Sequence, residues 1–169
     1  YNEIRSKGWQ LRGVQEPLEN MFFAGNEDLY AYRYDWDNLR DFFVGDFRKI
    51  IGAAHALEIP MISGDFSLAE EFAWIIYPRS PSRRFVSKNM MNFWTEFARN
   101  GEPGESSNDI IWNKYNPKTD KSILHIDEKK NLRIDDLDLR MEELVNEILS
   151  SQIIDNEENC ILLYETTNY

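Results

Sequence analysis

The chain holds two histidines, His55 and His125, and histidine is the residue best suited to move protons near neutral pH. His55 lies in the segment GAAHALEIP, where residues 52–54 and 56 are all small. A general base must come within hydrogen-bond distance of its nucleophile, so small neighbours leave room beside the imidazole. A catalytic histidine on a loop after a strand is one interpretation. A buried core histidine is the other, and the spacing alone favours neither.

Neither His125 nor any known sequence motif indicates a second catalytic or metal site. His125 lies in SILHIDEKK, where the alternation and the charged neighbours predict a surface strand residue. The Gly-x-Ser-x-Gly motif that presents a serine nucleophile is absent from the sequence, as are the Walker loop, Gly-x-Gly-x-x-Gly and His-Glu-x-x-His. The two histidines are too widely spaced for a zinc signature. We expect no metal and no cofactor.

Composition limits the partners. A net charge of −11 argues against nucleic acid and against docking on an anionic membrane, since both need clustered Lys and Arg. A 14 % aromatic share is typical of a globular protein. One cysteine, Cys160, and no Asn-x-Ser/Thr sequon favour a reducing, cytoplasmic compartment. Because the first residue is Tyr1 and not Met, we expect a fragment or a processed chain.

Hydrophobic periodicity predicts a mixture of helices and strands. The sequence has no internal repeat and no low-complexity linker, so we expect no boundary between independent domains. The most regular helix is expected over 82–100, closed by Gly101. The remaining predicted elements are helices over 9–24, 67–76 and 138–149, a helical turn near 47–51, an aromatic strand over 28–34, a hairpin of 123–126 with 132–134, and an edge strand or packing arm over 160–164.

Four ordered segments carry a family resemblance. The runs DLYAYRYDWD, GAAHALEIP and NFWTEFARNGEPG, followed by Trp112, resemble the C-terminal segments of type-B carboxylesterases, the carboxylesterase and cholinesterase family, and bacterial members most closely. The resemblance spans roughly residues 9–126. It implies the C-terminal part of an α/β-hydrolase fold: the last core strands, the loop of the catalytic histidine, packing helices and a small hairpin. Residues 1–169 would then be part of a single catalytic domain.

The resemblance also implies site roles. His55 matches the catalytic base of a serine ester hydrolase, and Glu58 matches an acidic residue of the polar network beside the site. In that family the serine and the triad glutamate precede the histidine, so both are expected from an N-terminal portion of the protein. Asp35 is the fallback for the acid. The substrate would be a small carboxylic ester.

Several alternatives stay open. Glu58 can instead pair with an arginine or a backbone amide. Phe42 and Phe43, in the loop before His55, fit either a wall of the substrate pocket or burial in the core. For the aromatic residues of 30–36, core packing is favoured over an acyl pocket. The whole protein can also be a non-catalytic binding or adhesion relative that retains the histidine, or the chain can be an autonomous domain.

Overall fold

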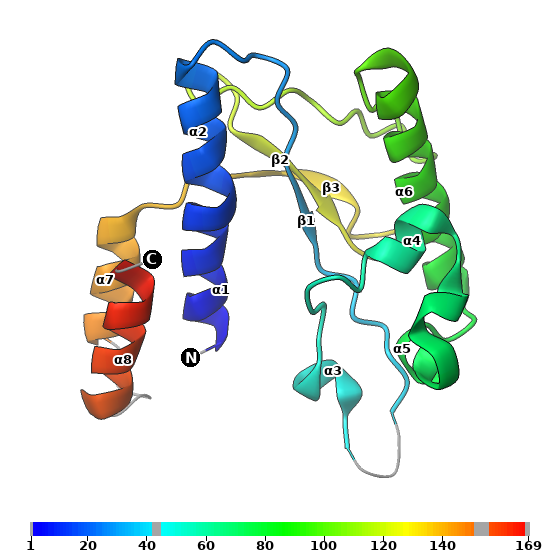
Figure 1. Cartoon of the computed structure of the whole chain (residues 1–169), viewed down its shortest axis with the longest axis horizontal. Helices are drawn as coiled ribbons and strands as arrows, with labels where there is room; N and C mark the ends of the chain where they lie inside the picture. The colour runs from blue at the N-terminus through cyan, green and yellow to red at the C-terminus, as the bar shows by residue number, and fades with distance from the viewer. Residues whose placement is uncertain (1, 42–44, 151–155, 168–169) are drawn as a thin grey trace. The chain divides into compact units, whose positions relative to one another are not determined.

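The computed structural model describes residues 2–41, 45–150 and 156–167 (Figure 1). The chain forms two compact units. One consists of Tyr1–Leu29, Lys114–Ser122 and Asp136–Tyr169, and the other of Tyr30–Asn113 and Ile123–Asp135.

The first unit is helical. Ile4, Ile148 and Leu162 form its buried cluster, one from each of three helices that lie side by side in Figure 1. Its elements are α1 (Asn2–Gln10), the π-helix η1 (Leu11–Gln15), α2 (Glu16–Phe23), α7 (Met141–Ser150) and α8 (Asn156–Thr167). The predicted helix over 9–24 is confirmed, although it begins earlier, and Gly25 follows it with a φ of 98°, as a glycine just past a helix end often does.

A buried glutamine joins two distant segments of this unit. Gln15, at the end of η1, accepts a hydrogen bond from the backbone N–H of Leu139 at 2.8 Å and donates to the carbonyl of the same residue at 3.1 Å. A primary amide satisfies both backbone groups of one residue in this way. The segment that leads into α7 is therefore held against the π-helical turn through Leu139.

Of the two alternatives for 160–164, the edge strand is wrong, because these residues lie inside α8, and the packing arm fits, because Leu162 packs against Ile4 and Ile148. An aliphatic run such as CILLY suits a strand or a helix equally when it is considered alone. The contact of Leu162 with Ile4 and Ile148 needs helical spacing to keep one side of the segment on the cluster.

A three-stranded sheet is the centre of the second unit. Its strands are β1 (Tyr32–Tyr34), β2 (Ser122–Ile126) and β3 (Arg133–Asp136), in the order β1-β2-β3. β1 runs parallel to β2, with Tyr32 opposite Leu124. The connection between β2 and β3 is too short for a parallel crossover, so these two strands form the predicted hairpin. The strand predicted over 28–34 is shorter than expected.

Helices surround the loop that follows β1. They are α3 (Phe47–Ile50), α4 (Ile59–Ser63), the 3-10 helix η2 (Phe66–Phe72), α5 (Ala73–Ile76) and α6 (Pro81–Asn100). α6 confirms the helix predicted over 82–100. The hydroxyl of Ser80 accepts from the backbone N–H of Arg83 at 3.0 Å, and Gly101 ends the helix with a φ of 75°.

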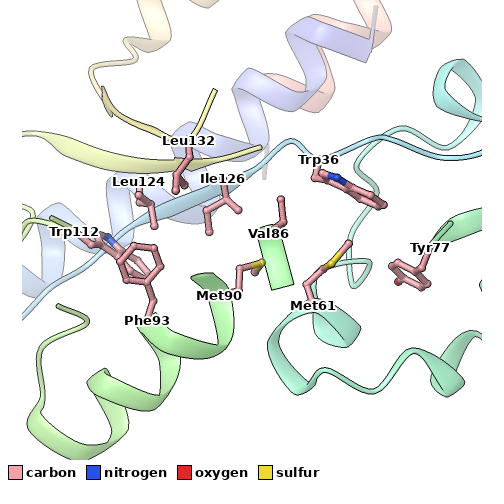
Figure 2. Close-up of a cluster of buried hydrophobic side chains, with 10 residues drawn as sticks. All are labelled: Trp36, Met61, Tyr77, Val86, Met90, Phe93, Trp112, Leu124, Ile126 and Leu132. Atoms are coloured by element: carbon pink, nitrogen blue, oxygen red, sulfur yellow. The ribbon is translucent and has the colours of Figure 1, made fainter. Parts of the chain in front are cut away.

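The core of this unit lies between α6 and the sheet. Figure 2 shows Val86, Met90 and Phe93 of α6 directed at Leu124 and Ile126 of β2, and all five are buried. The strand aromatics also pack on this cluster, as the sequence favoured. Trp36 is part of it, and the partly buried residues that pack against it include Tyr30, Tyr32 and Tyr34.

Candidate functional site

The chain that leaves β1 towards the predicted site is fixed at two points. The backbone N–H of Asp35 donates to the carbonyl of Ile126 at 2.9 Å, so the parallel pairing continues one residue past the strand. Trp36 follows, fully buried, and its Nε1 donates to Ser82 Oγ at 2.9 Å. The start of the segment that leads to His55 is therefore held by both β2 and α6.

Tight turns form the loop around His55. The N–H of Leu57 donates to the carbonyl of Ala54 at 3.2 Å, and that of Ile59 to the carbonyl of Ala56 at 3.3 Å. Ala56 has a φ of 71°. A residue with a Cβ adopts this left-handed conformation at a cost of about 1–2 kcal/mol. Strained backbone of this kind clusters at functional sites, and here it directly follows the candidate base.

The imidazole of His55 is at the surface of this loop, and the residue is exposed. In the part of the chain that the structure describes, no hydrogen bond or ion pair engages its ring. Within this chain the ring is therefore not part of a packed core. The ring is open to a group supplied from elsewhere in the protein, and its role as a base remains a prediction.

A buried tyrosine fixes the far side of the loop. Tyr77, at the end of α5, donates its hydroxyl to the carbonyl of Leu57 at 3.1 Å. Its ring stacks on Trp36, with centroids 6.5 Å apart (Figure 2). Burial, together with the charge of Glu58, raises the pKa of Tyr77 to about 12. The phenol therefore stays protonated, and remains a hydrogen-bond donor, throughout the neutral range.

We predict that Tyr77→Phe lowers the free energy of unfolding by about 1 kcal/mol, because it removes one hydrogen bond to a half-buried carbonyl and keeps the ring. Urea unfolding of the wild type and the variant measures the difference. Tyr32→Phe is the matched control, since no hydrogen bond of the Tyr32 hydroxyl occurs among the described residues. Equal stability of both variants and the wild type would show that the Tyr77 contact contributes nothing.

Glu58 lies half-buried at the start of α4, three residues after His55. Burial, and to a smaller extent the charge of Glu58, raises the pKa values of Tyr32, Tyr34 and Tyr77. Within the described residues, no hydrogen bond or ion pair engages this carboxylate. The alternative of a partner arginine or backbone amide therefore has no support here, and a role beside the catalytic base remains a prediction.

The two predicted pocket residues Phe42 and Phe43 lie outside the described residues. Their neighbours in the same loop differ from one another. Phe47 is half-buried, whereas Ile50 is 66 % exposed.

The surface position predicted for His125 is wrong. The residue is only 5 % exposed, and every residue of β2 is buried, because β2 is the central strand of the sheet. Nε2 of His125 lies 2.7 Å from Oδ2 of Asp35, and Nδ1 lies 3.6 Å from Oδ2 of Asp135. Neither ring nitrogen makes a hydrogen bond of good geometry, so both are close contacts with a carboxylate oxygen.

Asp35 was the alternative candidate for the triad acid. Its carboxylate contacts His125 and accepts a hydrogen bond from Nε of Arg33 at 2.7 Å. Burial raises the pKa of Asp35, but the contacts with His125 and Arg33 outweigh burial and hold that pKa below its usual value. Asp35 is therefore ionised at neutral pH, and its carboxylate lies against the ring of His125. This arrangement disfavours it as the acid of the His55 site.

The family model described as "Carboxylesterase family" matches residues 12–146, which is most of the chain. The chain belongs to the carboxylesterase family. None of the curated proteins matches it.

Membership of the carboxylesterase family establishes the fold class and indicates a general activity. The parallel β1-β2 pair, the helices packed on it and the hairpin are a part of the α/β-hydrolase fold, as predicted. The family supports hydrolysis of carboxylic esters as the general activity. In the described part of this family member, no helix is long and apolar enough to cross a bilayer.

Sequence reasoning missed two features of the loop. Tyr77 directly follows the helix predicted over 67–76 and was given no role, because nothing in its neighbours indicates that its hydroxyl reaches Leu57. The left-handed Ala56 was also unexpected, since glycine is the residue that normally signals this conformation. Both features depend on packing between segments and leave no local pattern.

Proposed function

We propose that this carboxylesterase-family chain supplies the general base, His55, of a serine ester hydrolase. The observation that carries the proposal is the exposed imidazole on a strained, small-residue loop directly after a core strand. Such a ring is open to a nucleophile, and the loop that presents it is anchored by Tyr77. Both properties are needed by a residue that must approach a reacting hydroxyl and then hold its position.

The reaction follows from this assignment. A serine hydroxyl attacks the ester carbonyl, and Nε2 of His55 accepts the hydroxyl proton. The tetrahedral intermediate collapses as His55 returns that proton to the leaving alkoxide, and the alcohol departs. Water then attacks the acyl-enzyme with the same base, which releases the acid and restores the serine. A carboxylate that orients the imidazole and amides that bind the oxyanion complete the site.

The serine and the orienting acid are proposed to come from an N-terminal portion of the same protein. The present sequence contains no Gly-x-Ser-x-Gly motif. The apolar residues that flank the loop also suit a surface covered by another part of the molecule. Ile50 is 66 % exposed and Ile59 is 49 % exposed. Residues 1–169 would thus form part of a single catalytic domain.

We also propose a cytoplasmic location. Cys160 is the only cysteine of the sequence, and it is free and exposed. Free, exposed thiols are typical of reducing compartments, since oxidising ones convert them to disulfides.

Labelling of the complete protein with a fluorophosphonate tests the proposal. This probe reacts with serines that a neighbouring base activates, so we expect one labelled serine, in a peptide outside this sequence, together with turnover of p-nitrophenyl acetate. Heat-denatured protein is the control for non-specific labelling. An unlabelled protein without turnover would point to the non-catalytic class. A labelled serine within residues 1–169 would overturn the assignment of the nucleophile to another portion.

A further inference from the structure

One charged side chain of α6 is linked to the loop of His55 by hydrogen bonds. Arg83 lies in the first turn of α6 and is half-buried. Its Nη1 donates to the backbone carbonyl of Tyr77 at 2.7 Å. The hydroxyl of Tyr77 in turn donates to the carbonyl of Leu57, two residues after His55. A single residue therefore separates the guanidinium of Arg83 from the histidine loop.

A second contact of Arg83 acts on the same tyrosine. The Cζ atom of Arg83 lies 4.2 Å from the centroid of the Phe66 ring, where a cation is attracted to the aromatic face. The Phe66 ring also contacts the ring of Tyr77, with centroids 5.4 Å apart. Arg83, Phe66 and Tyr77 thus contact one another pairwise. The guanidinium holds the backbone of Tyr77 directly and its ring through Phe66.

The charge of Arg83 has no carboxylate partner within the described residues, and its Nε is buried without a hydrogen bond. A half-buried cation without a counter-ion costs free energy, because it has lost part of its hydration. An unbranched apolar side chain would fill the same space without that cost. Departures of this kind from the most stable choice are found mainly at functional sites.

We propose that Arg83 is a positioning residue for His55: its guanidinium fixes Tyr77, and Tyr77 fixes the loop that carries the imidazole. This inference rests on the proposed function, in which His55 is the general base. Proton transfer needs the base within hydrogen-bond reach of the serine hydroxyl, and a displacement of about 1 Å lowers the rate roughly 100-fold. A smaller displacement is expected here, because the other contacts of the loop remain.

Kinetics of the complete protein with p-nitrophenyl acetate test the role. Arg83→Met removes the charge and the donor and keeps an unbranched side chain. We expect kcat to fall roughly fivefold to tenfold and KM to change less than about twofold, because the position of the base affects the transition state and not ester binding. Arg83→Lys retains a donor and a cation, so it should recover most of kcat.

The next residue of α6 provides the matched control. Arg84 is exposed, and in the part of the chain that the structure describes it makes no hydrogen bond and no ion pair. Arg84→Met changes the net charge by the same amount as Arg83→Met, and its kcat should equal that of the wild type. An equal loss in the two variants would assign the effect to net charge and overturn the proposal.

A double-mutant cycle shows whether Arg83 acts through Tyr77. Tyr77→Phe removes the hydrogen bond to Leu57 and should itself lower kcat by a similar factor. In the Tyr77→Phe background, Arg83→Met should lower kcat by less than about twofold more, because the link to the loop is already broken. Two losses that multiply in full would mean that Arg83 acts by another route, and this overturns the proposal.

The remaining outcomes are also decisive. An unchanged kcat in folded Arg83→Met, or a kcat in Arg83→Lys as low as in Arg83→Met, overturns the proposal. If circular dichroism shows that Arg83→Met does not fold, Tyr77→Phe decides, since an unchanged kcat in that variant means that the link has no catalytic role. Failure of the proposed function is recognised separately, by turnover that survives His55→Ala, while the same cycle in melting temperatures still reports on the contact of Arg83 with Tyr77.

Discussion

Alanine in place of His55 is expected to lower the kcat of the complete protein for a p-nitrophenyl ester by roughly 10⁴- to 10⁶-fold. The serine then has no base to accept its proton and no acid to protonate the leaving alcohol. Because the side chain is exposed and has no partner among the described residues, the free energy of unfolding should change by less than about 0.5 kcal/mol. Stopped assays at saturating ester and urea unfolding give the two values.

The other histidine provides the matched control. His125 is buried beside Asp35 in the central strand, so His125→Gln should lower the free energy of unfolding by about 1–3 kcal/mol and retain most of the turnover. The two variants should therefore have opposite effects on activity and stability. Near-normal turnover of a folded His55→Ala protein would rule out the assigned base.

The largest effect on stability is expected for Phe93→Ala, at about 3–5 kcal/mol. Phe93 is completely buried in α6, and its ring meets Trp112 edge-to-face with centroids 5.5 Å apart (Figure 2). The truncation loses this contact and leaves a cavity between α6 and the sheet, since a close-packed core relaxes only in part. Thermal and urea unfolding measure the loss.

Phe97 lies one turn further along the same helix and serves as the control. It is 45 % exposed, and its ring contacts Tyr30 at a centroid distance of 5.7 Å. Phe97→Ala should cost less than about 1 kcal/mol. Similar losses for both variants would mean that the core between α6 and the sheet is not packed as described.

Local chemistry made part of this fold predictable. The helix α6 (Pro81–Asn100) has a serine before its start, a proline in its first turn and a glycine after its end, and each of these acts within a few residues. The loop of His55 was also recognisable, because small residues surround the histidine and the adjoining segments resemble a family pattern. Signals of this kind need no knowledge of the distant chain.

The features that could not be predicted from the sequence depend on contacts between segments far apart in the chain. His125 is buried because β1 pairs on one side of its strand and β3 on the other. The alternation of residues within β2 does not indicate that either neighbouring strand is present. The helix at 156–167 depends on Ile4 and Ile148 in the same way. The aromatic run 28–34 forms a strand over only three residues, where β2 pairs with it.

For the site, the same distinction holds. Sequence spacing placed Glu58 three residues after His55, but the hydrogen bond from the Tyr77 hydroxyl to the carbonyl of Leu57 depends on the packing of α5 against this loop. Tyr77 and Leu57 belong to different segments, so no spacing rule relates them.

The parallel pairing of Tyr34 with Ile126 also affects the order in which parts of the chain can fold during synthesis. During synthesis the strand that leads to His55 emerges about ninety residues before the strand that pairs with it. Contacts between such distant segments form slowly, because a long loop must close first. On the ribosome, the histidine loop therefore stays without its support until the hairpin has left the exit tunnel. The loop that carries His55 is therefore expected to reach its final structure late in folding.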